Sequence, residues 1–139
     1  MKSFLISTLA ILLSVATIVH SGPIPDEFKD VAPDIRETCT KLTSVSTDLI
    51  EKAGLGDFVE DDKLKCYLKC LFDQFRLLSP KGFNFEAMLG LTPPKMKDAA
   101  VKAVKDCRDT TGKPDDMCDL SFNLHKCFYN SSPDQYFIM

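Results

Sequence analysis

The stretch that decides the fold is DDKLKCYLKCLF at residues 61–72. Its apolar side chains, continued by Phe75, recur at helical spacing and cluster within roughly 70° of one direction. Cys66 and Cys70 lie one helical turn apart and point to the opposite side. The pattern therefore predicts a helix held between two layers, packed on one face and tied covalently on the other.

Cysteines extend this pattern through the chain. In a secreted protein an even number of them predicts three disulfides, no free thiol and no metal site, although the Cys66 and Cys70 spacing is also compatible with metal ligands. Because these two residues share a helix face, each is expected to bond a different partner, and spacing leaves the pairing open. The six are Cys39, Cys66, Cys70, Cys107, Cys118 and Cys127.

Residues 1–21 have the composition of a secretory signal peptide. Lys2 supplies a positive start, an uncharged apolar run follows, and Val19 and Ser21 are small enough for the −3 and −1 positions of a cleavage site. A membrane anchor is the alternative, but the run is short of the about 20 apolar residues that a span needs. Cleavage after Ser21 would leave a mature domain of residues 22–139.

The mature chain is acidic and long enough for one domain. Without Lys2 it has 16 basic residues against 20 acidic ones, a net charge of −4. Binding to nucleic acid needs an excess of Lys and Arg, so no nucleic-acid partner is expected. No Gly-, Ser- or Pro-rich linker divides the chain, and about 118 residues suit a single core.

The mature chain is predicted to be all-α, because its apolar residues recur at helical spacing and no segment alternates convincingly as a strand. The tail, residues 130–139, ends in four large apolar side chains that we expect to fold back onto the domain. The expected helices are 28–39, one following the N-cap Ser46, one starting near 61, and 83–91, 96–107 and 117–128.

Catalytic chemistry is poorly supported. The mature chain has one histidine, His125, and it contains no nucleophile elbow, His-rich metal motif or glycine-rich phosphate loop. We therefore predict that the protein is not an enzyme and uses no cofactor. His125 flanks the apolar stripe of the last helix, where it is either an ordinary core-edge histidine or a pH-sensitive contact lining a pocket.

The spacing Cys39-x26-Cys66-x3-Cys70-x36-Cys107-x10-Cys118-x8-Cys127 is similar to that of a known family. The stretches DVAPDIR at 30–36, LHKCF at 124–128 and PDQYF at 133–137 add to the similarity, as does 61–72. Together they resemble the six-cysteine insect odorant-binding proteins, which include pheromone-binding and general odorant-binding proteins. The resemblance covers the whole mature chain.

The resemblance implies a fold and a function. The fold is six helices around a closed apolar cavity, with disulfides 39–70, 66–118 and 107–127. The function is a secreted, extracellular carrier of small hydrophobic odorant- or pheromone-like molecules, which moves them through aqueous sensillar lymph to olfactory receptors in the membrane. The implied state is a monomer or weak homodimer, with the tail folding over the pocket.

Ligand-binding positions follow from matching this sequence to the family's motifs. Phe128 stands where some relatives have Trp, and the chain has no Trp at all. The implied ligand-binding residues are Val31, Ala32, Ile35, Leu71, Phe72, Phe75, Met88, Leu89, Met96, Ala100, Ala103, Val104, Leu124, His125, Phe128, Tyr136 and Phe137.

Two other functions remain open from the sequence. One is a carrier of small lipidic ligands in another secretion; the other is a secreted interaction protein whose apolar side chains are solid core without a cavity. Asn130-Ser131-Ser132 is a glycosylation sequon closely followed by Pro133, which disfavours its use. Some family members release their ligand in acid. By this resemblance the tail is expected to act as a pH-sensitive lid over the pocket, so that ligand affinity is weaker at pH 5 than at pH 7, with His125 as the titrating group.

Overall fold

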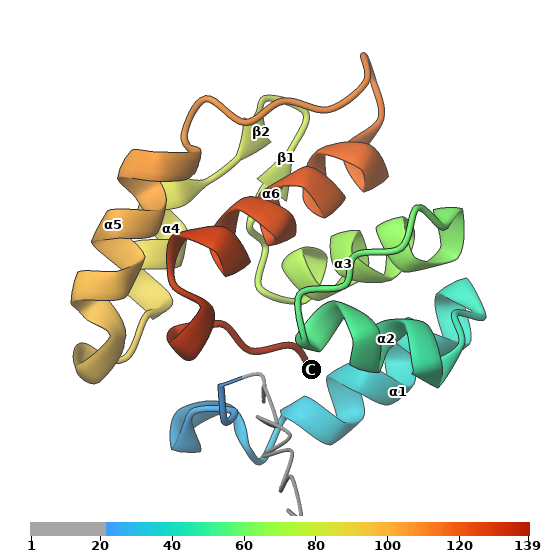
Figure 1. Ribbon diagram of the computed structural model, residues 1–139, viewed down its shortest axis with the longest axis horizontal. Coiled ribbons are helices and arrows are strands. Elements are labelled where there is room, and N and C mark those ends of the chain that lie inside the picture. The colour runs from blue at the N-terminus through green and yellow to red at the C-terminus, as the bar shows by residue number, and fades with distance from the viewer. Residues whose placement is uncertain (1–21) are drawn as a thin grey trace, which may run out of the picture.

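The computed structural model describes residues 22–139, so the expected signal peptide and its cleavage site lie outside the described residues. At the centre α3 (Asp62–Gln74) packs against α6 (Met117–Ser131). On one side α1 (Ala32–Thr43) packs against α3, and on the other α5 (Lys97–Cys107) packs against α6. Two shorter helices complete the all-α, six-helix fold that the sequence predicted: α2 (Thr47–Gly54) and α4 (Phe85–Leu91), seen in Figure 1.

Side-chain caps explain where several helices begin. Asp61 accepts a hydrogen bond from the Leu64 amide at 2.9 Å, and Ser46 caps α2 as expected. Asn84 and Asp116 cap α4 and α6 in the same way. Each of these side chains satisfies an amide that the first turn of a helix leaves without a partner.

Two local predictions were wrong. The expected first helix is split, because a 3-10 turn (Asp26–Phe28) precedes α1 and Pro33 occupies the first turn of that helix. The helix expected over 83–91 begins two residues later, at Phe85, because Phe83 belongs to a hairpin of two-residue strands, β1 (Leu78–Ser79) and β2 (Gly82–Phe83). Gly82 allows the turn because its φ is +113°, a conformation that other residues rarely adopt.

The apolar face of α3 serves two buried clusters. Leu64, Tyr67 and Leu68 lie in the large core together with side chains of α1, α2 and α6. Phe72, one turn further on, lies in a smaller core with Leu124 of α6 and the hairpin. The helix is therefore buried on more than one side, as its sequence predicted.

The three disulfides join the pairs that the family resemblance implied. Cys39–Cys70 ties α1 to α3, Cys66–Cys118 ties α3 to α6, and Cys107–Cys127 ties α5 to α6. Cys66 and Cys70 do bond different partners, and all six cysteines are paired. Four helices are thus linked covalently in the order α1, α3, α6, α5.

A buried ion pair reinforces the contact between α3 and α6. The ammonium of Lys65 lies 2.9 Å from the carboxylate of Asp119 and 2.7 Å from that of Glu60. The second oxygen of Asp119 accepts the Lys113 amide at 2.9 Å. These hydrogen bonds hold the pKa of Lys65 above and the pKa of Asp119 below their usual values, so both groups stay charged.

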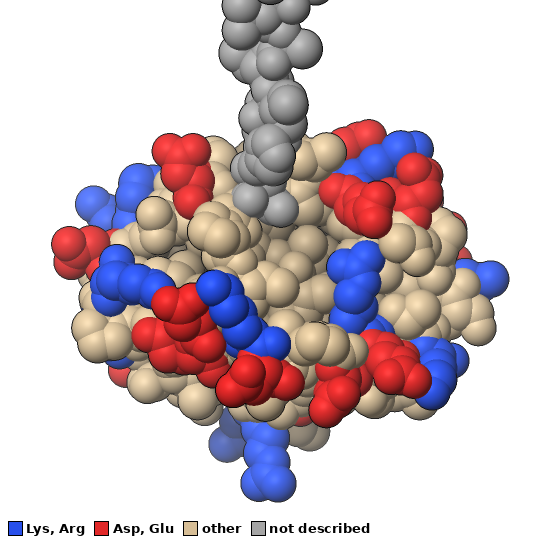
Figure 2. Space-filling view, turned by 90° about the horizontal axis from the view of Figure 1, so that it is seen from below, with Lys and Arg blue, Asp and Glu red and all other residues tan. Residues whose placement is uncertain are grey.

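Charges of both signs cover the surface. Figure 2 shows acidic and basic side chains lying beside one another around one face, without a large area of a single sign. Several of these are pairs one helical turn apart, such as Lys41–Glu37 and Lys102–Asp106. Among residues 22–139, no helix has the length and apolarity required to cross a membrane.

Candidate ligand-binding site

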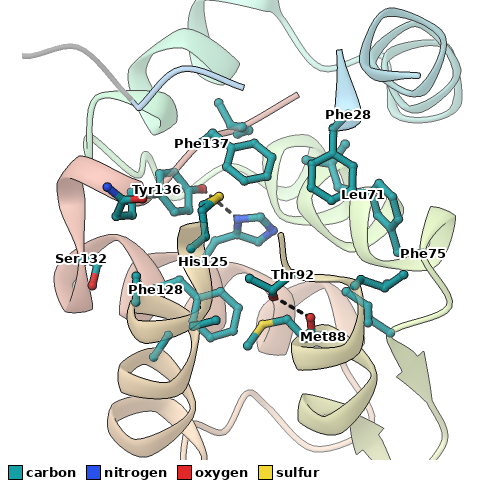
Figure 3. A pocket seen from close by; sticks show the side chains of 18 of the residues that line it. Phe28, Leu71, Phe75, Met88, Thr92, His125, Phe128, Ser132, Tyr136 and Phe137 are labelled. Carbon is teal, nitrogen blue, oxygen red and sulfur yellow. Dashed lines mark hydrogen bonds between the residues drawn. The ribbon is translucent and has the colours of Figure 1, made fainter. Parts of the chain in front are cut away.

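A cavity of about 210 Å³ lies between α3, α4, α5, α6 and the C-terminal segment (Figure 3). Its wall is mostly hydrocarbon, and none of the described residues that line it is Lys, Arg, Asp or Glu. The polar side chains of the wall are those of Thr92, His125, Ser132, Gln135 and Tyr136.

Small side chains on α5 help to leave this space open. Ala99, Ala100 and Ala103 face the cavity, and opposite them α3 presents Leu71 and Phe72. An alanine side chain ends at Cβ, so the gap between the two helices is not filled from the α5 side. The Cys107–Cys127 disulfide joins α5 to α6 and thereby fixes the position of this wall.

His125 is the buried polar group of the cavity. Its Nδ1 lies 2.8 Å from the hydroxyl of Tyr136, and its ring stacks on Phe72 with centroids 4.3 Å apart. Burial lowers the pKa of His125 from 6.5 to about 3, although the Leu68 carbonyl of α3 opposes part of the decrease. The ring is therefore neutral at physiological pH.

The C-terminal segment closes one side of the cavity. The Tyr67 hydroxyl donates to the main-chain oxygen of Met139, and the Gly22 amide donates to the carbonyl of Tyr136 at 2.8 Å. Phe137 stacks on Phe28, so apolar contacts hold the segment as well. Tyr67 of α3 is therefore the polar partner of the terminal residue.

The family comparison agrees with this architecture. The profile of the PBP/GOBP family matches residues 22–131, most of the chain. This chain belongs to that insect odorant-binding protein family. Its members are non-enzymatic carriers, which confirms the prediction that the protein is not an enzyme. Family membership and three disulfides together indicate an extracellular protein.

Named relatives share either sequence or fold with this odorant-binding protein. General odorant-binding protein 72 of Anopheles gambiae is 24% identical, over 78% of this chain and 93% of its own length. The structure of odorant binding protein 5 of Apis mellifera superposes with a TM-score of 0.75 at 21% identity, covering 85% of this chain and 99% of that one. The fatty acid binding protein OBP56a from the oral disk of the blowfly Phormia regina has a TM-score of 0.61 at 22% identity, covering 81% and 97%.

Many of the expected binding residues surround the cavity of this odorant-binding protein. They come from five separate segments, and their side chains point inward, as Figure 3 shows for those it labels. These residues are Leu71, Phe72, Phe75, Met88, Met96, Ala100, Ala103, His125, Phe128, Tyr136 and Phe137.

Three expected residues on α4, α5 and α6 lie outside the lining. Leu89, Val104 and Leu124 each follow or precede a residue that faces the cavity, and neighbours on a helix differ in direction by about 100°. Leu124 packs in the small core instead. Val104 is buried, with 7% of its surface exposed, and does not line the cavity. Val104 and Leu124 are therefore core residues, whereas Leu89 is half-buried and belongs to neither buried cluster.

The expected residues of the first helix also lie elsewhere. Val31, at the start of α1, is 44% exposed, and Ala32 and Ile35 pack in the large core. The reason is that α1 lies against α3, tied to it by Cys39–Cys70, and turns its apolar face toward that core. Phe28, in the 3-10 turn before α1, reaches the cavity in their place.

Sequence reasoning also missed part of the lining. Leu91, Thr92 and Pro93 lie at the end of α4 and in the link to α5, and both helices line the cavity. Ile138 and Met139 belong to the tail that was expected to fold back onto the domain. The sequence therefore contained a pattern from which these five could have been predicted. The others follow from the exact path of the chain. The missed residues are Phe28, Leu77, Leu91, Thr92, Pro93, Ala99, Ser132, Gln135, Ile138 and Met139.

Proposed function

We propose that this protein carries small, mainly apolar molecules through an aqueous secretion and delivers them to membrane olfactory receptors. The observation that supports the proposal is the cavity, bordered by four helices and the C-terminal segment and walled almost entirely by hydrocarbon. Transfer of an apolar molecule from water into such a space is favourable in proportion to the apolar area buried. Most of the expected binding residues line it, and we propose that those are the ones that contact the ligand.

Cavity size narrows the expected ligands. About 210 Å³ is less than the about 300–1,000 Å³ of pockets for drug-sized molecules, so small ligands of roughly 8 to 20 heavy atoms are expected. Odorant-sized volatile molecules fall in this range. Affinity near micromolar, on the order of −8 kcal/mol, is expected for them.

The experiment is displacement of the fluorescent probe N-phenyl-1-naphthylamine from the mature chain, which suits a protein with no tryptophan. The variant Ala100→Leu places extra carbon in the cavity and should weaken probe binding about tenfold. The neighbouring change Val101→Leu is the matched control, because Val101 is 57% exposed on the outer face of α5 and does not line the cavity. Absence of probe binding to the wild type at high micromolar concentration would instead support the solid-core interaction protein.

A carrier in another secretion is the second candidate. The blowfly relative is a fatty acid binding protein from the oral disk, which supports a carrier of small lipidic ligands in another secretion. Antibody staining separates the two candidates: signal in the lymph of olfactory sensilla supports olfaction, and signal confined to glands or mouthparts overturns it.

Secretion itself is part of the proposal. Residues 1–21 would direct export and be removed, and the N-terminal sequence of protein collected from culture medium should begin at Gly22. Mass spectrometry of the same sample reports whether Asn130, exposed near the end of α6, bears a glycan. Sedimentation at micromolar concentration tests the expected monomer or weak homodimer.

A further inference from the structure

The cavity wall is least firmly held at α4. Among the six helices of residues 22–139, α4 is the one that has no buried residue. The helices α1, α3, α5 and α6 are joined by disulfides, and α2, which has no cysteine, has three buried residues instead. Figure 1 shows α4 beside α5 at the edge of the molecule, and its main helix contact is with α5. Neither a covalent bond nor a buried side chain therefore fixes α4.

Little in the sequence of α4 stabilises it as a helix. It has seven residues, whereas an isolated helix in water needs about 12–15. Gly90 lies in its last turn, where glycine is less favourable than alanine because it loses more conformational freedom on folding. Apart from chain neighbours and the backbone of the same helix, no heavy atom lies within 4 Å of where a Cβ of Gly90 would be, and its φ is not positive. Packing thus does not require glycine here, and the residue weakens the last turn.

Polar contacts near the surface hold the end of α4. The Thr92 hydroxyl donates to the Met88 carbonyl at 2.7 Å, as Figure 3 shows, and the Thr92 amide donates to the Leu89 carbonyl at 3.3 Å. The ammonium of Lys97, the first residue of α5, also donates to the Leu89 carbonyl. Thr92 and Lys97 are only half-buried, so water can replace these bonds when the turn opens. Opening therefore leaves no polar group without a partner.

The same turn lies between the cavity and the solvent. Met88 and Leu91 of α4 line the cavity, and Thr92 and Pro93 continue the lining. Among the described residues of the lining, Leu91 is the one large apolar residue that is also exposed, at 47%. Its side chain thus lies at the boundary between the cavity and water, and its displacement would connect the two.

The C-terminal segment, which borders the cavity elsewhere, is held more firmly. Tyr136 and Met139 are both buried. The Tyr136 hydroxyl is hydrogen-bonded to His125, the Tyr136 carbonyl accepts from the nitrogen of Gly22, and the main-chain oxygen of Met139 accepts from Tyr67. Moving this segment breaks buried hydrogen bonds and exposes apolar side chains, whereas moving the end of α4 breaks bonds that water can replace.

We propose that the last turn of α4, residues 88–92, is the entrance of the cavity: it opens locally, and ligands enter and leave past Leu91. The inference rests on the proposed carrier function and adds the route that the ligand takes. The observed rate of entry is then the rate of passage multiplied by the fraction of molecules in which the turn is open. A change that alters only this fraction changes association and dissociation equally and leaves the affinity as it was.

Binding kinetics of N-phenyl-1-naphthylamine to the mature chain, measured by stopped-flow fluorescence, test this. Gly90→Ala strengthens the last turn, so association and dissociation should both slow about two- to fivefold while Kd stays within about twofold. Lys97→Met removes the bond to the Leu89 carbonyl, so both rate constants should rise about twofold or more, again with little change in Kd. Neither Gly90 nor Lys97 lines the cavity, so the contacts with the probe stay the same.

Two exposed positions supply matched controls. Thr38→Ala raises helix propensity in α1, and Lys105→Met removes a lysine from α5; neither residue lines the cavity, so both rate constants should keep their wild-type values. Unchanged rate constants in Gly90→Ala, or equal slowing in Thr38→Ala, overturns the proposal. It is also wrong if Gly22→Ala, which loosens the C-terminal segment, speeds both steps and Lys97→Met does not.

Amide hydrogen exchange of the ligand-free protein separates the entrance from the carrier function. The amides of residues 88–92 should exchange faster than those of α3 and α6 in the wild type, and more slowly in Gly90→Ala than in the wild type. Protection of these amides equal to that of α3 overturns the proposal even if the probe binds. If exchange behaves as expected and the wild type binds no probe, the carrier function is refuted, and the passage of ligands through α4 with it.

Discussion

Single residues in this protein show what periodicity reveals and what it omits. The sequence correctly marks His125 as flanking an apolar stripe and Leu124 as apolar, but it does not show which of the two faces a cavity. That depends on the rotation of α6 against α3 and α5, which tertiary packing and two disulfides set. The same holds for the pairs Met88 and Leu89, and Ala103 and Val104.

The free energy of unfolding should decrease as the pH is lowered, because His125 is buried as a neutral ring. Its folded pKa is about 3 and its ordinary value 6.5, so between these values the unfolded chain binds more protons than the folded one. Stability from the neutral ring is therefore complete above pH 6.5 and is lost as the pH falls toward 3, by on the order of 5 kcal/mol in all. Urea unfolding at pH 7, 5 and 4 should show a flatter profile for His125→Phe; parallel profiles would contradict this.

Ligand affinity should begin to change only at a lower pH than the sequence suggested. The expectation of weaker binding at pH 5 relied on a histidine that titrates near its ordinary pKa, whereas burial holds the pKa of His125 at about 3. The affinity of the cavity for N-phenyl-1-naphthylamine should therefore be the same within about twofold at pH 7 and pH 5. Titration by probe displacement at both values checks this, and a large loss at pH 5 that His125→Phe abolishes would show that the ring is charged there.

Lining residues and core residues should respond differently to truncation. Leu68 is fully buried in the large core, so Leu68→Ala should lower the free energy of unfolding by about 2–5 kcal/mol. Phe128 is partly exposed and borders the cavity, so Phe128→Ala should change probe affinity at a smaller loss of stability. Equal losses of stability in the two variants would mean that Phe128 is simply core.

Helices and loops differ in how well sequence predicts them. Capping residues such as Asp61 predict a helix start, because a short side chain must meet a free amide. The hairpin at 78–83 has two residues per strand, too few for any alternating pattern, and it forms because Gly82 turns the chain. The C-terminal segment is an intermediate case. Its apolar ending predicts that it packs onto the domain, but its sequence does not show which residues it contacts.

The N-terminal residues of the domain should help to hold the C-terminal segment in place over the cavity. The nitrogen of Gly22, which would be the terminal ammonium once residues 1–21 are removed, donates to the Tyr136 carbonyl, and a Cβ at Gly22 would lie 2.8 Å from the carbonyl oxygens of Asp134 and Tyr136. Gly22→Ala should therefore displace the C-terminal segment, speed amide exchange in residues 134–139 and weaken probe binding a few-fold. Pro23→Ala, at an exposed neighbouring position, is the control. Unaltered exchange and affinity in Gly22→Ala would show that the contact is dispensable.

At the scale of the whole molecule, the disulfide pairing is the feature of the fold that the cysteine positions alone do not predict. The shared face of Cys66 and Cys70 excludes one easy pairing and leaves the others open, and it was the family resemblance that implied the three bonds observed. These bonds order α1, α3, α6 and α5, whereas α4 has no cysteine and no fully buried residue. The cavity thus has a rigid frame with one wall that packing alone holds.

The disulfides should divide their effects between stability and binding. In the chain-entropy account the bond closing the longest loop, Cys66–Cys118 with a separation of 52 residues, stabilises by about 4 kcal/mol, and Cys107–Cys127 with a separation of 20 by about 3 kcal/mol. Binding should follow the reverse order, because Cys107–Cys127 holds the α5 wall of the cavity against α6. Double serine variants of each pair can be compared by thermal unfolding, helical circular dichroism and probe affinity. The 107–127 variant should retain its helices and lose most probe binding; wild-type affinity in that variant would mean that packing alone positions α5.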